Sequence, residues 1–153
     1  MSYFLSLLCR WSQPLTVGFV SEFLEEGVFF DETPELHASP SADLDSEFDR
    51  IEVRYHPKRR PIIIESSSPE LVAEETAEIV DLARSRKVPK AIPQQLVSVR
   101  QIIAFELDQP RLTEDAWVFC DCLEAVIAKK LDAIIYAPDD GFYDKNLKLI
   151  HVL

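Results

Sequence analysis

Three aspartates and two aromatic residues meet in one short segment of the chain, residues 138–144 (PDDGFYD). Carboxylate oxygens bind Mg²⁺ and Ca²⁺, and a desolvated carboxyl group can act as a general acid. The acids, Asp139, Asp140 and Asp144, lack the regular alternation of oxygen ligands found in an EF-hand loop. Asp-Asp-Gly is also ordinary turn chemistry, because glycine can take a positive φ. The segment is therefore compatible with a metal or catalytic site, a partner contact or a plain turn.

A second acidic segment, residues 31–47 (DETPELHASPSADLDSE), shows neither helical nor strand periodicity. Its two prolines and six acids predict a long surface loop, with a short helix over residues 41–47 as the alternative. Carboxylates gathered where no regular element requires them indicate a partner-binding surface, and aromatic side chains often form the centre of an interface. We therefore predict a surface made by Asp31, Glu32, Glu35, Asp43, Asp45, Asp139, Asp140, Phe142, Tyr143 and Asp144.

The chain is acidic overall, with 27 Asp and Glu against 16 Lys and Arg and a net charge of −11. Nucleic acids and anionic membranes are polyanions, so this charge disfavours both as partners. It favours fast association with a basic protein. The one cationic cluster that we identify is His56, Lys58, Arg59 and Arg60. It is predicted to be the solvated turn of a hairpin rather than a phosphate-binding site.

The sequence contains no recognisable motif for a metal, a nucleotide or a nucleophile. Three glycines are too few for a phosphate-binding loop, and neither GxGxxG nor GxxxxGK[ST] occurs. Cys120 and Cys122 lie in a helical pattern and so point about 160° away from each other, which prevents shared metal binding. The histidines, His37, His56 and His151, are scattered, and no HExxH or GxSxG occurs. We predict no cofactor and no metal.

Three cysteines, an odd count without framework spacing, indicate a reducing compartment. The apolar opening MSYFLSLLC lacks a basic n-region and is too short to span a bilayer, and its alternation is typical of a strand. We therefore predict a cytoplasmic protein without disulfides, in which Cys120 faces the core.

Hydrophobic periodicity and capping residues divide the chain into strands and helices. Apolar residues two apart predict strands, and apolar residues three and four apart predict helices. Ser68 before Pro69, and Thr113 before two acids, are helix start signals. The predicted strands are 3–11, 48–55, 62–64, 96–107, 133–137 and 147–153, and the predicted helices are 14–26, 69–87 and 113–130.

The helix over 113–130 has the strongest of these patterns. We expect Asp121 and Glu124 on the side opposite its apolar arc. In the helix over 14–26, Gly27 is placed to end the helix in the left-handed conformation. The predicted apolar arc of the 113–130 helix contains Phe119, Cys120, Cys122, Leu123, Val126, Ile127 and Leu131.

The element order β-α-β-β-α-β-α-β-β predicts one α+β domain over residues 1–153, with the acidic surface loop at 31–47. Its first six elements match the split β-α-β, ferredoxin-like order, in which helices cover one face of a mainly antiparallel sheet. The final α-β-β extends that sheet or begins a second half-unit. Because this fold hosts many unrelated activities, it specifies no function.

Three functions are open from the sequence alone. The one we favour is a non-enzymatic module that binds a basic protein, as an inhibitor, an immunity-type antidote or a regulatory adaptor. The second is a small carboxylate- or metal-dependent hydrolase or transferase that uses the 139–144 turn with Glu106 or Glu52. The third is a homodimeric small-ligand sensor, by analogy with ferredoxin-like sheets that pair.

Overall fold

Within residues 2–153, which a computed structural model describes, the chain is a mixed α+β protein with four α-helices and eight strands. The helices are α1 (Val17–Gly27), α2 (Pro69–Ser85), α3 (Ala91–Leu96) and α4 (Glu114–Leu131). The strands are β1 (Tyr3–Cys9), β2 (Glu35–Ser39), β3 (Arg50–Arg54), β4 (Ile62–Ser66), β5 (Gln101–Leu107), β6 (Ala133–Ala137), β7 (Gly141–Tyr143) and β8 (Leu149–Val152). The predicted α+β class with a mainly antiparallel sheet is confirmed.

Hydrogen-bonded strands follow the order β2-β3-β4-β5-β1-β6-β7-β8. In a ferredoxin-like sheet built from the predicted elements, the strand at 3–11 would lie between those at 62–64 and 96–107. Here β5 is the neighbour of β4 instead. The ferredoxin-like arrangement is therefore not confirmed, and the sheet is larger than that fold requires.

These elements form two compact units. The first unit consists of the residues up to Phe4, Pro14–Ser66 and Phe105–Glu124. The second consists of Leu5–Gln13, Ser67–Ala104 and Ala125–Leu153. Strands β1 and β5 and helix α4 contribute residues to both units. The single domain over 1–153 stays a prediction.

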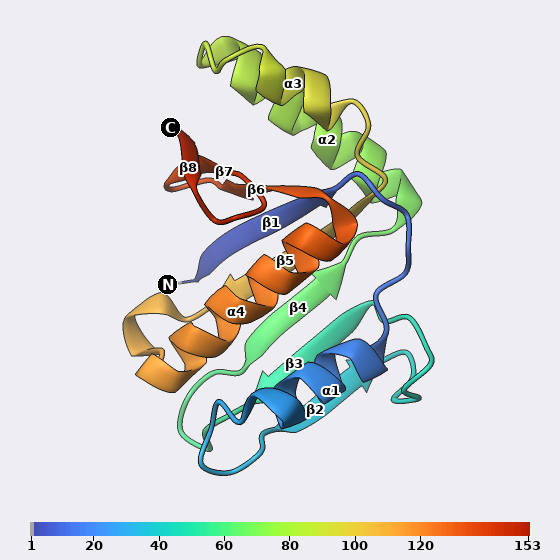
Figure 1. Ribbon diagram of the computed structural model, residues 1–153, viewed down its shortest axis with the longest axis vertical. Helices are drawn as coiled ribbons and strands as arrows, with labels where there is room; N and C mark the ends of the chain where they lie inside the picture. Colours follow the sequence, from blue (N-terminus) through green and yellow to red (C-terminus); the bar gives the residue numbers. More distant parts are fainter. Residues whose placement is uncertain (1) are drawn as a thin grey trace. The chain divides into compact units, whose positions relative to one another are not determined.

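Helix α1 belongs to the first unit. Thr16 is its N-cap, because the Thr16 hydroxyl accepts a hydrogen bond from the Phe19 N–H at 3.2 Å. Val28, rather than Gly27, takes the left-handed conformation, with φ of 47°. Glycine is needed at position 27 for space instead, since a Cβ there would lie 2.0 Å from the ring of Phe29. In Figure 1, α1 is drawn in front of β2 and β3.

Residues 35–39, inside the predicted acidic loop, form the edge strand β2. It pairs antiparallel with β3, with Leu36 opposite Val53. Leu36 and Ala38 are its two apolar residues, and both are half-buried. An edge strand needs only one apolar face, and two alternating residues are too few to signal it in the sequence. The loop prediction is therefore wrong for this stretch.

Five aromatic rings form a cluster inside the first unit. The ring centroid of Phe119 lies 5.5 Å from that of Phe29, 5.8 Å from Phe30 and 6.1 Å from Phe23. Phe30 also contacts Tyr55 at 5.9 Å. The Tyr55 hydroxyl is buried and has no hydrogen-bond partner among residues 2–153, and burial raises its pKa. The cluster therefore joins α1, the loop after it and α4 through apolar contacts.

Helices α2 and α3 pack against each other in the second unit (Figure 1). Ser68 caps α2 as predicted, because its hydroxyl accepts a hydrogen bond from the Leu71 N–H at 3.4 Å. The predicted strand 96–107 begins too early, since residues 91–96 form α3 and β5 starts only at Gln101. The core of this unit contains Leu8, Val72, Ile79, Val80, Ala83, Val88, Ile92, Leu96, Ile102, Ile134 and Phe142.

Strands β6, β7 and β8 form an antiparallel meander in the second unit. The predicted strand 133–137 is β6, and the predicted turn leads directly into the short strand β7, which was not predicted. Gly141 has a φ of 151°, and a Cβ there would lie 2.0 Å from the His151 carbonyl oxygen. Glycine is therefore required where β7 approaches β8.

Helix α4 has nearly the predicted limits but a different buried face. Thr113 caps it, accepting a hydrogen bond from the Ala116 N–H at 3.2 Å. Cys120 is buried as predicted, whereas Cys122 and Val126 are exposed and Glu124 is only 6% exposed. The assignments of these last three residues are wrong, because a broad apolar arc does not show which stripe the rest of the fold will cover.

A membrane-spanning helix needs roughly 20 consecutive apolar residues. No helix within the described residues 2–153 meets this requirement.

Candidate functional site

The acids of the segment 31–47 lie around β2 in the first unit. Glu35, on the strand itself, pairs with His37, with 3.1 Å between Oε2 and Nε2. Because both side chains are largely exposed, this pair contributes little to stability. All predicted contact residues of this segment are exposed: Asp31, Glu32, Glu35, Asp43 and Asp45.

The loop after β2 is held against α1 by backbone hydrogen bonds. The Gly18 N–H donates to the Leu44 carbonyl at 2.8 Å, and the Val17 N–H donates to the Ser46 carbonyl at 3.0 Å. Glycine at position 18 permits this approach, since a Cβ there would lie 2.6 Å from the Leu44 oxygen. The backbone that carries the exposed side chains of Leu44 and Asp45 is therefore tied to α1.

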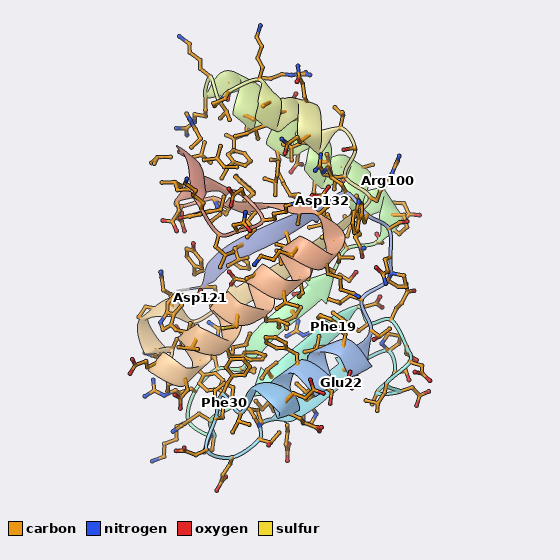
Figure 2. All side chains as sticks on the ribbon, in the orientation of Figure 1. Phe19, Glu22, Phe30, Arg100, Asp121 and Asp132 are labelled. Carbon is orange, nitrogen blue, oxygen red and sulfur yellow. The ribbon has the colours of Figure 1, made fainter. Side chains whose placement is uncertain are left out.

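A hollow of about 490 Å³ lies between α1 and this loop, and we name it the acidic hollow. Glu22, Glu25 and Asp45 supply three carboxylates to its wall, and Phe19 and Leu44 supply apolar surface. Among the described residues that line it, none is basic. Figure 2 shows Phe19 and Glu22 on α1. Carboxylates beside apolar surface can hold the charged end and the aliphatic stem of a lysine or arginine.

Asp45 is a predicted contact residue, whereas Glu22 and Glu25 are not among the residues predicted for the surface. Their spacing of three puts both carboxylates on one side of α1. That spacing was visible in the sequence. The backbone pairing of α1 with residues 44–46 was not, because it joins segments far apart in the chain.

The segment 139–144 forms the connection between β6 and β7 in the second unit, together with β7. Asp139 and Asp140 are exposed. Phe142 has no exposed surface, and its ring centroid lies 5.1 Å from that of Tyr136. Phe142 is therefore a core residue in this structure, which corrects its predicted role as a surface anchor.

Asp144 has a structural role in the same segment. Its Oδ1 accepts hydrogen bonds from the backbone N–H of Asn146 at 2.8 Å and of Lys148 at 3.0 Å. Tyr143 is half-buried, and burial together with the nearby Asp140 raises the pKa of its phenol. Because 31–45 and 139–144 belong to different units, one continuous acidic surface stays a prediction.

Glu52 and Glu106, two of the carboxylates suggested for catalysis, are paired with arginines in the first unit. Glu52 contacts Arg54 at 3.0 Å and Arg50 at 3.2 Å, and these hydrogen bonds lower its pKa, Arg54 most. Glu106 contacts Arg60 at 3.6 Å. Glu52 is thus held in its charged form, which is the opposite of what a general acid needs. Within residues 2–153, no group of three or more His, Cys, Asp or Glu residues is arranged to hold a metal ion.

The basic hairpin over residues 56–60 joins β3 to β4, as predicted. Its groups are engaged within the first unit. The Lys58 N–H donates to Nδ1 of His56 at 3.1 Å, and the guanidinium of Arg59 donates to the Arg111 carbonyl. Arg60 forms the ion pair with Glu106 described above. These contacts favour a structural turn over a phosphate site.

One buried acid, Glu124, was not identified as such from the sequence. Burial raises its pKa to about 8, and the negative charge of Asp121 contributes to the shift. Figure 2 labels Asp121 on the same helix, α4, and its own pKa is raised by partial burial. Near neutral pH the Glu124 carboxyl therefore holds a proton. The stability of the folded protein should therefore depend on pH, because ionising the buried Glu124 carboxyl costs free energy.

Comparisons of the chain with family models, with curated proteins and with solved structures find no match. Function is therefore argued from the chemistry of the residues themselves.

Proposed function

We propose that the chain is a non-enzymatic protein-binding module and that its first unit binds a basic segment of a partner protein. The observation that supports this most directly is the acidic hollow, where three carboxylates and two apolar side chains face one space. Such a module could act by binding alone, as an inhibitor, an immunity-type antidote or a regulatory adaptor. The proposed setting is the cytoplasm.

The chemistry of the hollow fits a lysine or arginine side chain. Hydrogen bonds between a cationic head and carboxylates are charge-assisted, and they are roughly twice as strong as neutral ones. The aliphatic stem of the same side chain can lie on Phe19 and on Leu44, which is 60% exposed. Since backbone hydrogen bonds already hold the loop against α1, binding does not have to order the backbone of residues 44–46.

Acids of the first unit would speed the first encounter with the partner. The net charge of −11 attracts a cationic protein, and the exposed acids Asp31, Glu32, Glu35 and Asp43 of this unit add to the attraction. This attraction is screened beyond about 10 Å at 0.1 M salt. Asp139, Asp140, Tyr143 and Asp144 stay candidate contacts in the second unit. Because salt screens the electrostatic attraction, the association rate should fall as salt is added.

A defined basic peptide tests the proposal. Fluorescein-labelled Lys-Leu-Lys-Leu-Lys-Leu is titrated with the wild-type protein and with a variant that combines Glu22→Gln, Glu25→Gln and Asp45→Asn. The control variant combines Glu74→Gln, Glu78→Gln and Asp81→Asn on α2, which changes the net charge equally. We expect the dissociation constant to rise about tenfold for the hollow variant and less than twofold for the control.

Equal weakening in both variants would show that only net charge matters and would overturn the proposed site. Circular dichroism of both variants checks that the fold is intact. The hydrolase and the homodimeric small-ligand sensor stay predictions, and no feature of the described residues favours either over a binding module.

A further inference from the structure

A second cationic cluster lies where α2 ends and α3 begins, in the second unit. The stretch 84–90 (RSRKVPK) contains four cations and no acid. This corrects the identification of the hairpin at 56–60 as the one cationic cluster. Such a concentration of positive charge is unexpected in a chain with a net charge of −11. The four cations are Arg84, Arg86, Lys87 and Lys90.

A hollow of about 640 Å³ lies within this cluster, and we name it the basic hollow. Arg84, Lys87 and Lys90 supply its charged groups. Pro89 supplies exposed apolar surface beside them, whereas Val88 and Pro93 line the hollow but are buried. Among the described residues that line it, none is acidic. The charge of this hollow is thus opposite to that of the acidic hollow of the first unit.

The four cations have no ion-pair partner within residues 2–153, whereas some other arginines of the chain do. Arg10 contacts Asp132 at 2.5 Å, and Arg54 contacts Glu52 at 3.0 Å. No carboxylate of the described residues lies within 4.0 Å of the cationic groups of the cluster. Like charges held together repel each other, and a bound anion would relieve this repulsion. The cluster therefore carries positive charge that no carboxylate of the described residues neutralises by a direct ion pair.

Backbone hydrogen bonds hold the chain reversal under the basic hollow. Lys87 has a φ of 55°, and its N–H donates to the Arg84 carbonyl at 3.3 Å. The next N–H, of Val88, donates to the Ala83 carbonyl at 3.0 Å, which completes a Schellman motif. Val88 and Ala83 are buried in the core of the unit. Helix ends of this kind usually have glycine at the left-handed position, so the lysine here is unfavourable for the backbone and supplies a charge to the hollow.

From the charge, the apolar surface and the fixed backbone, we infer that the basic hollow binds an acidic peptide segment of a partner protein. Such a segment would place two or three carboxylates on Arg84, Lys87 and Lys90 and one apolar side chain on the exposed ring of Pro89. A protein segment is favoured over nucleic acid, because the overall charge repels a long polyanion. A peptide can also place an apolar side chain on the proline surface beside the cations, which a phosphate backbone cannot do.

Fluorescein-labelled Glu-Glu-Leu-Glu-Glu-Leu tests the inference by anisotropy with the full chain. The hollow variant combines Arg84→Gln, Lys87→Gln and Lys90→Gln, and the control combines Lys58→Gln, Lys129→Gln and Lys148→Gln at exposed positions. We expect the wild type to bind, the hollow variant to bind at least tenfold more weakly and the control to change less than twofold. A peptide with Gln for Glu should not bind.

The Lys87→Gly variant tests whether weaker peptide binding could result from misfolding. Glycine suits the left-handed φ, so this variant should melt a few degrees above the wild type while binding the acidic peptide more weakly. Loss of binding together with loss of stability would count against a direct contact by Lys87. The Glu22, Glu25 and Asp45 variant should bind the acidic peptide unchanged, which separates this inference from the proposed function.

Three results would overturn the inference. The first is no binding by the wild type, or equal binding by the hollow variant. The second is tighter binding of a ten-nucleotide thymidine oligomer than of the acidic peptide, which would assign the hollow to nucleic acid. The third is a dimer in sedimentation velocity that the hollow variant loses, which would assign it to a second copy of this chain.

Discussion

Asp132 contacts Arg10 at the junction between α4 and β6, with 2.5 Å between Oδ2 of Asp132 and Nη2 of Arg10. The other carboxylate oxygen of Asp132 lies 3.6 Å from Nζ of Lys145. Asp132 also has a left-handed φ of 52°, and its carbonyl accepts a hydrogen bond from the Arg10 N–H at 3.3 Å. Asp132 thus reverses the chain after α4 and also forms an ion pair with Arg10, the residue that follows β1. Figure 2 labels Asp132 at this junction.

Asp132→Ala should destabilise the protein by about 2 kcal/mol, because alanine loses the ion pair and disfavours the left-handed conformation. Asp132→Gly should cost less, since glycine accepts that conformation. Urea denaturation measures both variants. A double-mutant cycle with Arg10→Ala should give a coupling of roughly 0.5–1 kcal/mol, because both side chains are partly exposed. Equal losses for Ala and Gly would show that backbone conformation has no part in the effect.

Glu124 should make stability fall as pH rises. Its pKa is raised from 4.5 to about 8, so the folded state keeps a proton that the unfolded state releases between these values. The associated stability is fully present below pH 4.5 and is lost as pH rises through about 8. The full difference is on the order of 3–5 kcal/mol.

Glu124→Gln isolates this effect, because glutamine has a similar size and no charge. The free energy of unfolding is measured in urea from pH 5 to pH 9 for both proteins. The wild-type stability minus that of the variant should decrease up to about pH 8 and then level off. A constant difference would contradict the raised pKa, since other acids titrate equally in both proteins.

The three cysteines should differ in reactivity, and none should be in a disulfide. Burial raises the pKa of Cys9 to about 12 and raises that of Cys120 well above its ordinary value, whereas Cys122 is exposed. The thiolate is the reactive form, so one thiol should react quickly in the native protein at pH 8 and three after unfolding.

Cys122→Ser is the control for thiol titration, and it should remove the fast phase without changing the fold. Recovery of fewer than three thiols from the unfolded wild type without reductant would contradict the free cysteines. A second fast thiol in the native protein would contradict the burial of Cys9 or Cys120.

Local signals in the sequence determined several elements of this protein. Ser68 and Thr113 cap the two long helices, and β6 covers the predicted residues 133–137. Caps and short-range periodicity depend on residues at most four positions apart, so a single sequence displays them. Composition likewise indicated an acidic chain, and the predicted α+β class is confirmed.

The tertiary structure decided which faces of these elements are covered. Glu124 is buried and Cys122 exposed because the surrounding fold selects one stripe of α4, and helical periodicity alone permitted another. The edge strand β2 forms because β3 supplies its hydrogen bonds. The acidic hollow exists because the Leu44 carbonyl pairs with α1 across the intervening chain. Such contacts join distant segments, and their free energy depends on surfaces that come together only when the whole unit folds.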